Sequence, residues 1–298
     1  MTFTRRRFLA ATAAGLAVAP ADAAEAVRTV PRTGARVPLV GLGTWITFNV
    51  GRDPDLLARS TAVMRAFFEE GGGLIDSSPM YGTSQNTLGH GLAELGYPKS
   101  LIAADKVWTS GVSGGPAQVA ESRRDWGVDA FDVLQVHNLV AWEGHLDRLL
   151  ERREAGEIGH VGVTTSHGRR HAELERIMRT RPIDVVQLTY NVADRAPEAR
   201  LLPLARERGI GVIVNRPYRR GALIERFRGE PLPGFAAEIG AASWAQFLLK
   251  FVVSHPDVTV AIPATTSPEH LRENKAAARG PLPDDAMRAR MAAYVESL

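Results

Sequence analysis

The stretch that decides the fold is Gly73-Leu74-Ile75-Asp76-Ser77-Ser78-Pro79-Met80-Tyr81-Gly82. A short apolar run opens it, and a proline and a glycine follow as turn residues. An apolar run bounded in this way predicts a strand over Gly73–Ser78. The strand would deliver Asp76 near its end and Tyr81 in the loop that follows.

The same pattern recurs along the chain from Leu39 onward, with short apolar runs separated by longer amphipathic ones. The other predicted strands are Leu39–Trp45, Leu101–Val107, Phe131–His137, His160–Thr165, Asp184–Tyr190, Gly211–Asn215 and Val258–Ile262. Between the strands, apolar residues recur at helical spacing, for example at Trp244, Phe247, Leu248, Phe251 and Val252. Eight strands that are each followed by a helix predict parallel pairing.

Two parallel architectures fit this order. An open doubly wound sheet would show a glycine-rich fingerprint after an early strand, but Gly41-Leu42-Gly43 is followed by Thr44-Trp45 and not by a third glycine. A closed (β/α)8 TIM barrel fits the strand count and the length. We further expect an N-terminal β-hairpin over Arg28–Pro38 that plugs the barrel, an irregular insertion at Pro231–Gly234 and an extra C-terminal helix over Ala286–Val295.

The composition is that of a globular protein, since 45% of the 298 residues are hydrophobic. The chain has no cysteine, which excludes disulfides, thiolate catalysis and cysteine-ligated metal centres. Arginine and glutamate alternate along the helical stretches as on solvated faces, without a basic stripe. We therefore expect no nucleic-acid partner.

The first 23 residues are a different kind of sequence. Arg5–Arg7 precede Phe8-Leu9, and an apolar run over 10–19 follows. Ala21-Asp22-Ala23 then has the small-x-small pattern of a signal-peptide cleavage site. This order is typical of a twin-arginine export signal, and the run is too short to span a bilayer. Its removal takes away three arginines and one aspartate, so the formal net charge falls from +3 to +1.

We therefore predict a leader over 1–23 and a single barrel domain over 24–298. Export would use the twin-arginine machinery and end in the periplasm or outside the cell, with no stable membrane span in the mature form. The twin-arginine route carries proteins that are already folded, so an exported enzyme could carry a tightly held cofactor with it.

Polar side chains end three neighbouring strands of the predicted barrel. Asp76 lies at the end of the second strand, Lys106 near the end of the third and His137 at the end of the fourth. Because catalytic groups sit at the C-terminal ends of barrel strands, these three and Tyr81 should meet at one mouth. Taken singly, the Asp–Lys pair would be a structural salt bridge and His137 a hydrogen-bonded core residue; their joint order favours catalysis.

The chemistry of this set can be argued from its side chains. A phenol is a poor acid at neutral pH unless a cation stabilises its phenolate, which Lys106 could do with Asp76 as its ion-pair partner. Tyr81 would then be a general acid toward an oxygen that gains negative charge, and His137 would donate a second hydrogen bond to it. The strand ends carry no His, Asp and Glu cluster with metal-ligand spacing, so we expect no metal.

The chain resembles the aldo/keto reductase superfamily. The segments that resemble its three signatures are 76–82, 105–108 and 134–138, with further similarity at 41–45, 156–163 and 187–191. The resemblance runs from about Val37 to Asn274. It implies a catalytic tetrad of Asp76, Tyr81, Lys106 and His137 with Tyr81 as proton donor, and hydride transfer between a nicotinamide and an aldehyde or ketone, or the corresponding alcohol.

The resemblance also implies a nicotinamide dinucleotide extended across the barrel mouth, NADP(H) in preference to NAD(H). The positions that it assigns to the cofactor are Thr44, Asp76, Thr164, Thr165, Gln187, Pro217, Gly221, Leu223, Thr265, Glu273 and Asn274. Trp45 and Trp108 would shape an apolar pocket for a small carbonyl or alcohol substrate.

The chain departs from the family's pattern at four of its cofactor positions. Thr165 stands where many members carry Asn, and Asn215 stands where many place an aromatic ring against the nicotinamide. Ala264 and His270 replace the Lys and Arg that often bind the 2′-phosphate of NADP(H). Arg272 would be the substitute cation.

Two other functions fit the same fold. A non-catalytic nicotinamide-binding sensor or regulator would keep the cofactor cavity but have no need of Tyr81. An unrelated barrel hydrolase or metal enzyme would need the ligand cluster that the strand ends lack.

Overall fold

Eight parallel strands close into a barrel in the computed structural model, which describes residues 25–298. The strands are β3 Leu42–Gly43, β4 Gly73–Asp76, β5 Leu101–Val107, β6 Val133–Val136, β7 His160–Thr164, β8 Val185–Thr189, β9 Gly211–Asn215 and β10 Val260–Ala261. They neighbour one another in chain order, and parallel bridges at Val40–Ala261 and Gly43–Ala264 join the last strand to the first. The predicted (β/α)8 barrel is confirmed, because a doubly wound sheet would reverse its strand order.

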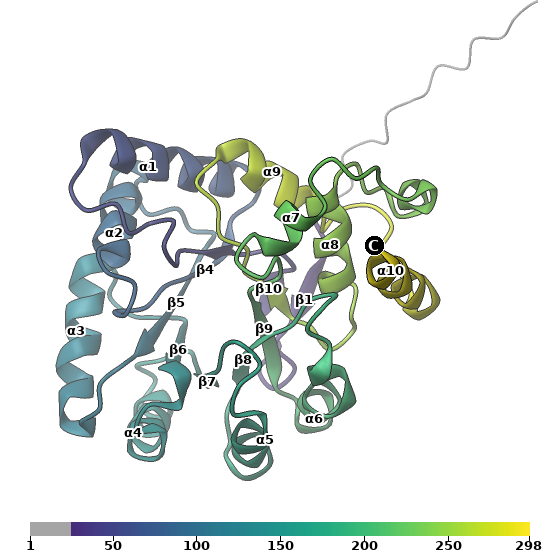
Figure 1. Cartoon of the computed structure of the whole chain (residues 1–298). Helices are drawn as coiled ribbons and strands as arrows, with labels where there is room; N and C mark the ends of the chain where they lie inside the picture. The colour runs from purple at the N-terminus through teal and green to yellow at the C-terminus, as the bar shows by residue number, and fades with distance from the viewer. Residues whose placement is uncertain (1–24) are drawn as a thin grey trace, which may run out of the picture.

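Helices form an outer ring around these strands (Figure 1). The helices are α1 Pro54–Glu69, α2 Ser84–Leu95, α3 Gly115–Trp126, α4 Trp142–Glu154, α5 His171–Thr180, α6 Leu201–Arg208, α7 Ala222–Arg226, α8 Trp244–Val253, α9 Pro268–Ala276 and α10 Asp285–Ser297. Between β9 and α8 the chain inserts α7 and a 3₁₀ segment, Gly234–Ile239. The irregular stretch predicted at Pro231–Gly234 is thus one part of a longer insertion.

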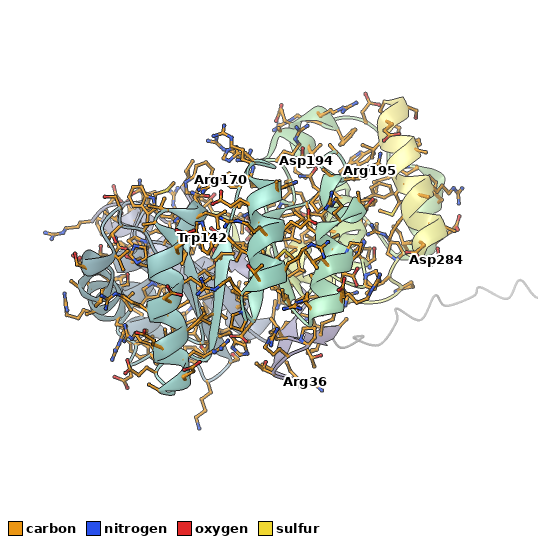
Figure 2. All side chains as sticks on the ribbon, turned by 90° about the horizontal axis from the view of Figure 1, so that it is seen from below. Arg36, Trp142, Arg170, Asp194, Arg195 and Asp284 are labelled. Atoms are coloured by element: carbon orange, nitrogen blue, oxygen red, sulfur yellow. The ribbon has the colours of Figure 1, made fainter. Side chains whose placement is uncertain are left out.

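The predicted N-terminal hairpin is present and closes the end of the barrel at which the strands begin. Its strands β1 Val27–Thr29 and β2 Arg36–Pro38 pair antiparallel. Val30 and Val37 are buried among side chains from inside the barrel. Figure 2 shows Arg36 at one end of the molecule and Arg170 and Asp194, from loops after β7 and β8, at the other. The hairpin therefore leaves the opposite, C-terminal face of the strands free for a site.

The hydrophobic core has two layers, because successive residues of a strand point to opposite faces. Leu74 belongs to the small cluster inside the barrel, while its neighbour Ile75 belongs to the large cluster between barrel and helices. The inner cluster also takes Ala104, Val133, Val185, Ile213, Val260 and Ile262. These side chains fill the barrel below the site, so it is a packed support and not a channel.

Local signals set the helix ends. Asp53 caps α1 by accepting from the backbone N–H groups of Asp55 and Leu56, both at 3.0 Å, and Pro54 follows it. Gly209 ends α6 in the left-handed conformation with φ of 67°, which other residues adopt at a cost. Ser243 caps α8 by accepting from the backbone N–H of Gln246.

The extra C-terminal helix is confirmed as α10. Asp284 caps it by accepting from the backbone N–H of Met287 at 2.8 Å. Its Arg288 donates to the Phe251 carbonyl of α8 and pairs with Glu198 at 2.7 Å. These contacts hold the helix against the outer ring.

Two predicted strands, Leu101–Val107 and Gly211–Asn215, have the observed bounds, and the other six are shorter than predicted. The first strand shortens most, from Leu39–Trp45 to Leu42–Gly43, because the backbone turns after Gly43 and the Thr44 carbonyl accepts from Phe48 N–H at 3.1 Å. The predicted leader, residues 1–23, lies outside the described residues.

Candidate active site

A cavity of about 610 Å³ opens at the C-terminal ends of the strands. Asp76, Tyr81 and His137 line it. Lys106 is fully buried beside Asp76. The structure therefore brings the four predicted catalytic side chains together, as their positions at neighbouring strand ends require.

The Lys106 ammonium is held by two oxygens. It donates to Asp76 Oδ2 at 2.6 Å and to the Ser77 carbonyl at 2.7 Å. Burial alone would lower the pKa of Lys106, but the charges of Asp76 and other acidic neighbours raise it above its ordinary value. Gln187 donates to the second Asp76 oxygen, Oδ1, at 2.8 Å. The lysine therefore stays a fixed positive charge.

The Tyr81 ring lies near both this charge and the imidazole. The Lys106 ammonium is 5.2 Å from the ring centroid, and the His137 ring packs edge-on with centroids 5.6 Å apart. Burial raises the pKa of Tyr81 to about 12, and the charge of Lys106 acts in the opposite direction. As predicted, the charge of Lys106 lowers the pKa of Tyr81, but burial raises that pKa by more. Tyr81 therefore holds its proton at neutral pH.

His137 is buried and neutral. Burial, and then the charge of Lys106, lowers its pKa well below the ordinary value. Its Nδ1 lies 2.6 Å from the Ser78 hydroxyl. Within residues 25–298, Nε2 has no hydrogen-bond partner, so it can interact with a molecule in the cavity. The site thus combines a protonated phenol, a neutral imidazole and a fixed ammonium.

Most of the predicted cofactor positions line the same cavity. Those that do are Thr44, Asp76, Thr164, Thr165, Gln187, Pro217, Gly221, Thr265, Glu273 and Asn274. Leu223 does not line it, because its side chain packs into the outer core. Of the two predicted pocket tryptophans, Trp45 lines the cavity and Trp108 does not, with 40% of its surface exposed.

Sequence reasoning missed several lining residues. Ile46 and Met80 are exposed apolar side chains at the rim, and no periodic pattern identifies them. No sequence pattern singles out Arg220, yet its guanidinium stacks 4.3 Å from the centre of the Trp45 ring. Loops after β3 and β9 are joined by this contact, which no sequence spacing predicts.

One atom tests whether a cofactor fits. Thr165 lines the cavity, and its buried hydroxyl has no hydrogen-bond partner in the described part of the chain. A buried polar group without a partner is rare in proteins, and a ligand amide would satisfy it. The cavity volume falls within the range of small-molecule and cofactor sites. The residues present fit a nicotinamide dinucleotide.

Among residues 25–298, no three His, Asp or Glu side chains gather closely enough to hold a metal ion. In that same range, every helix is too short or too polar to cross a membrane.

A cavity at the carboxyl ends of a closed parallel barrel, lined by a phenol and an imidazole beside a buried lysine–aspartate pair, is the candidate active site of this (β/α)8 barrel. Residues 39–294 match the family model described as aldo/keto reductase family, so the chain belongs to that family.

Known proteins agree with this assignment. The methylglyoxal reductase YeaE of Escherichia coli is 26% identical over 245 residues, which cover 80% of this chain and 85% of that one. The NADH-specific methylglyoxal reductase of the same organism is 24% identical over 194 residues, 54% of this chain and 58% of that one. A Klebsiella pneumoniae aldo/keto reductase solved with NADP and acetate superposes with a TM-score of 0.74 at 24% identity, over 88% of this chain and 93% of that one.

Proposed function

We propose that this protein reduces a small aldehyde or ketone with a nicotinamide cofactor, or runs the reverse oxidation of the alcohol. The observation that carries the proposal is the meeting of Asp76, Tyr81, Lys106 and His137 at one cavity. A binding protein has no need of a protonated phenol beside a fixed cation, whereas carbonyl reduction needs a proton donor at the oxygen.

The cavity residues would hold the cofactor along one wall. Thr164, Thr165 and Gln187 would bind the carboxamide, and the loop from Arg216 to Gly221 would bind the pyrophosphate. When bound, the reduced nicotinamide supplies a hydride to the carbonyl carbon. Gln187 also donates to Asp76, so one side chain would link cofactor position to the ion pair.

The protein's own groups would handle the oxygen. Tyr81 O–H would donate its proton to the carbonyl oxygen as that oxygen gains negative charge. The neutral His137 would donate a hydrogen bond from Nε2 to the same oxygen, and the Lys106 charge would stabilise the phenolate left behind. Asp76 holds that ammonium in place at 2.6 Å.

NADP(H) remains the favoured cofactor, supported by the NADP bound to the Klebsiella pneumoniae structure. The NADH-specific relative of Escherichia coli keeps NAD(H) as the alternative. Arg272 does not serve as the expected substitute cation, because it pairs with Glu69 at 2.8 Å and does not line the cavity. The other two positions expected near the 2′-phosphate, Ala264 and His270, do line the cavity.

Export would make cofactor supply the central problem. The arginine-rich start of the chain supports export by the twin-arginine route to the periplasm or exterior, and we expect the protein to leave the cytoplasm folded with its nucleotide tightly bound. Mass spectrometry of protein recovered from the periplasm would check both points. We expect a mature chain that starts near Ala24 and carries nucleotide. A retained leader would contradict export, and protein without nucleotide would contradict tight binding.

The test of the reaction is Tyr81→Phe. It should lower the rate of carbonyl reduction by about 10²- to 10⁴-fold, the usual contribution of a positioned acid, and leave the Kd for NAD(P)H unchanged. Stopped-flow reduction of small aldehydes and fluorescence titration give the two quantities. Carbonyl reduction that persists in Tyr81→Phe would show that Tyr81 is not the proton donor. A wild-type protein that binds nucleotide and reduces no carbonyl would instead favour the sensor.

A further inference from the structure

Ser78 is a buried serine that lies behind His137. Its side chain is fully shielded from solvent and does not line the cavity. Its hydroxyl oxygen is 2.6 Å from His137 Nδ1 and accepts the backbone N–H of Met80 at 3.2 Å. Ser78 therefore contacts the imidazole from the side opposite to a bound molecule.

The direction of the Ser78–His137 hydrogen bond follows from counting partners. A hydroxyl has one proton to donate and two lone pairs that accept. Met80 N–H uses one of the lone pairs. In the part of the chain that the structure describes, the acceptor within reach of the hydroxyl proton is His137 Nδ1. A buried hydroxyl that donates to nothing is unfavourable, so Ser78 donates and Nδ1 accepts.

This direction decides where the imidazole keeps its proton. A neutral imidazole carries one N–H, and a nitrogen that accepts a hydrogen bond is the one without it. With Nδ1 as acceptor, the proton sits on Nε2, the nitrogen that faces the cavity. We propose that Ser78 is a positioning residue that fixes His137 as the Nε2–H tautomer and thereby presents a hydrogen-bond donor to the substrate.

The proposal rests on the proposed reaction for its purpose, since a carbonyl oxygen accepts hydrogen bonds and never donates them. The opposite tautomer would turn a lone pair of Nε2 toward that oxygen and repel it. Two hydrogen bonds, from Met80 N–H to Ser78 and from Ser78 to His137, also run in series toward the Nε2–H donor that faces the cavity. Bonds aligned in series polarise one another, which strengthens the last donor.

Nitrogen NMR of the wild-type protein tests the tautomer without any substrate. In protein labelled with ¹⁵N-histidine, two-bond ¹⁵N–¹H spectra separate protonated from unprotonated ring nitrogens, and His137→Gln identifies the signals of His137 by their loss. We expect a protonated Nε2 and an unprotonated Nδ1. A protonated Nδ1 would overturn the proposal. This outcome is independent of whether the protein reduces carbonyls, so failure of the proposed reaction would be recognised separately.

Substitution tests the dependence on Ser78. In Ser78→Ala, Nδ1 loses its donor, and the two tautomers should become mixed; Ser78→Thr keeps the hydroxyl and should keep the wild-type spectrum. For carbonyl reduction, Ser78→Ala should lower kcat by about 10- to 100-fold with KM changed by less than about twofold, and Ser78→Thr should restore most of kcat.

The matched control is Ser60→Ala, which removes a buried hydroxyl that donates to the Leu56 carbonyl of α1. It should change neither the His137 spectrum nor kcat. If Ser78→Ala keeps both the wild-type tautomer and the wild-type kcat, Ser78 does not position His137. A loss of kcat that comes with an unchanged tautomer contradicts the proposal as well.

Discussion

The Lys106 ammonium and the Asp76 carboxylate face each other at 2.6 Å from neighbouring strands β5 and β4, and both side chains are shielded from water. A buried pair of this kind is costly to break, because removal of one partner leaves an uncompensated charge. The pair is therefore part of the stability of the barrel as well as part of its site.

Asp76→Asn should lower the free energy of unfolding by about 3–5 kcal/mol, since the Lys106 charge remains buried without its counter-ion. Urea unfolding at neutral pH measures the loss. The matched control is Glu157→Gln, whose carboxylate is exposed and pairs with the partly exposed Arg152 at 2.9 Å, and it should cost less than about 1 kcal/mol. Equal losses in the two variants would refute a special cost of the buried pair.

Thr165→Val should weaken nicotinamide nucleotide binding by about 2- to 10-fold, the value of one net hydrogen bond, because the free hydroxyl is the group expected to meet the ligand. Fluorescence titration with NADPH gives the Kd. Thr61→Val removes a buried hydroxyl on α1 that also lacks a partner among residues 25–298 and belongs to no cavity-lining residue, and it should leave the Kd unchanged. An unchanged Kd in Thr165→Val would show that the nicotinamide carboxamide does not bind at Thr165.

Arg272→Ala should leave the ratio of NADP⁺ to NAD⁺ affinity unchanged, because Glu69 and Glu70 hold the guanidinium. His270→Arg should raise NADP⁺ affinity by about 10- to 100-fold without a matching gain for NAD⁺, since a charge-assisted hydrogen bond contributes about 1.5–3 kcal/mol. Calorimetric titration with each nucleotide measures both. A drop in NADP⁺ preference in Arg272→Ala would show that this side chain leaves its acidic partners to bind phosphate.

Asp105→Asn tests a buried carboxyl next to Lys106 in the chain. Burial raises the pKa of Asp105 from an ordinary 3.8 to about 7, and its Oδ1 has no hydrogen-bond partner within the described residues. The raised pKa means that the folded state binds this proton more tightly than the unfolded state. The stability due to Asp105 is therefore complete below about pH 4 and is lost as pH rises through about 7.

The substitution should thus stabilise the protein at pH 8 by a few kcal/mol, by linkage of a shift of about three pKa units, and the gain should shrink toward zero near pH 4. Gln85 donates to Asp105 Oδ2 at 2.6 Å and can donate to an asparagine oxygen in the same way. Urea unfolding of both proteins from pH 4 to pH 8 measures the difference. A gain that does not vary with pH would show that Asp105 titrates normally.

Much of the fold could be predicted because the signal is local. An apolar run between turn residues specifies a strand wherever it stands, and eight of them with helices between leave few topologies. The ends of the strands could not be predicted as well, because hydrogen bonding to the neighbouring strands decides where each strand ends. The short strand Leu42–Gly43 illustrates this.

The meeting of the proposed catalytic side chains could be predicted because a barrel turns order along the chain into position around a mouth. Asp76, Lys106 and His137 end successive strands, so their meeting followed from topology alone. Cofactor and substrate positions depended on resemblance, and two of them, Leu223 and Trp108, do not line the cavity. Resemblance fixes a place in the chain, whereas the direction of a side chain depends on local packing.

By itself, the sequence determined the barrel, its order of strands and the residue types at its mouth, because these depend on hydrophobic pattern and chain direction. Only the tertiary structure decided that burial affects the pKa of Tyr81 more than the charge of Lys106 does. It also decided that Arg272 pairs with acidic neighbours and that Ser78 hydrogen-bonds His137. Each of these depends on desolvation or on contacts between side chains, and neither is encoded in the spacing of residues along the chain.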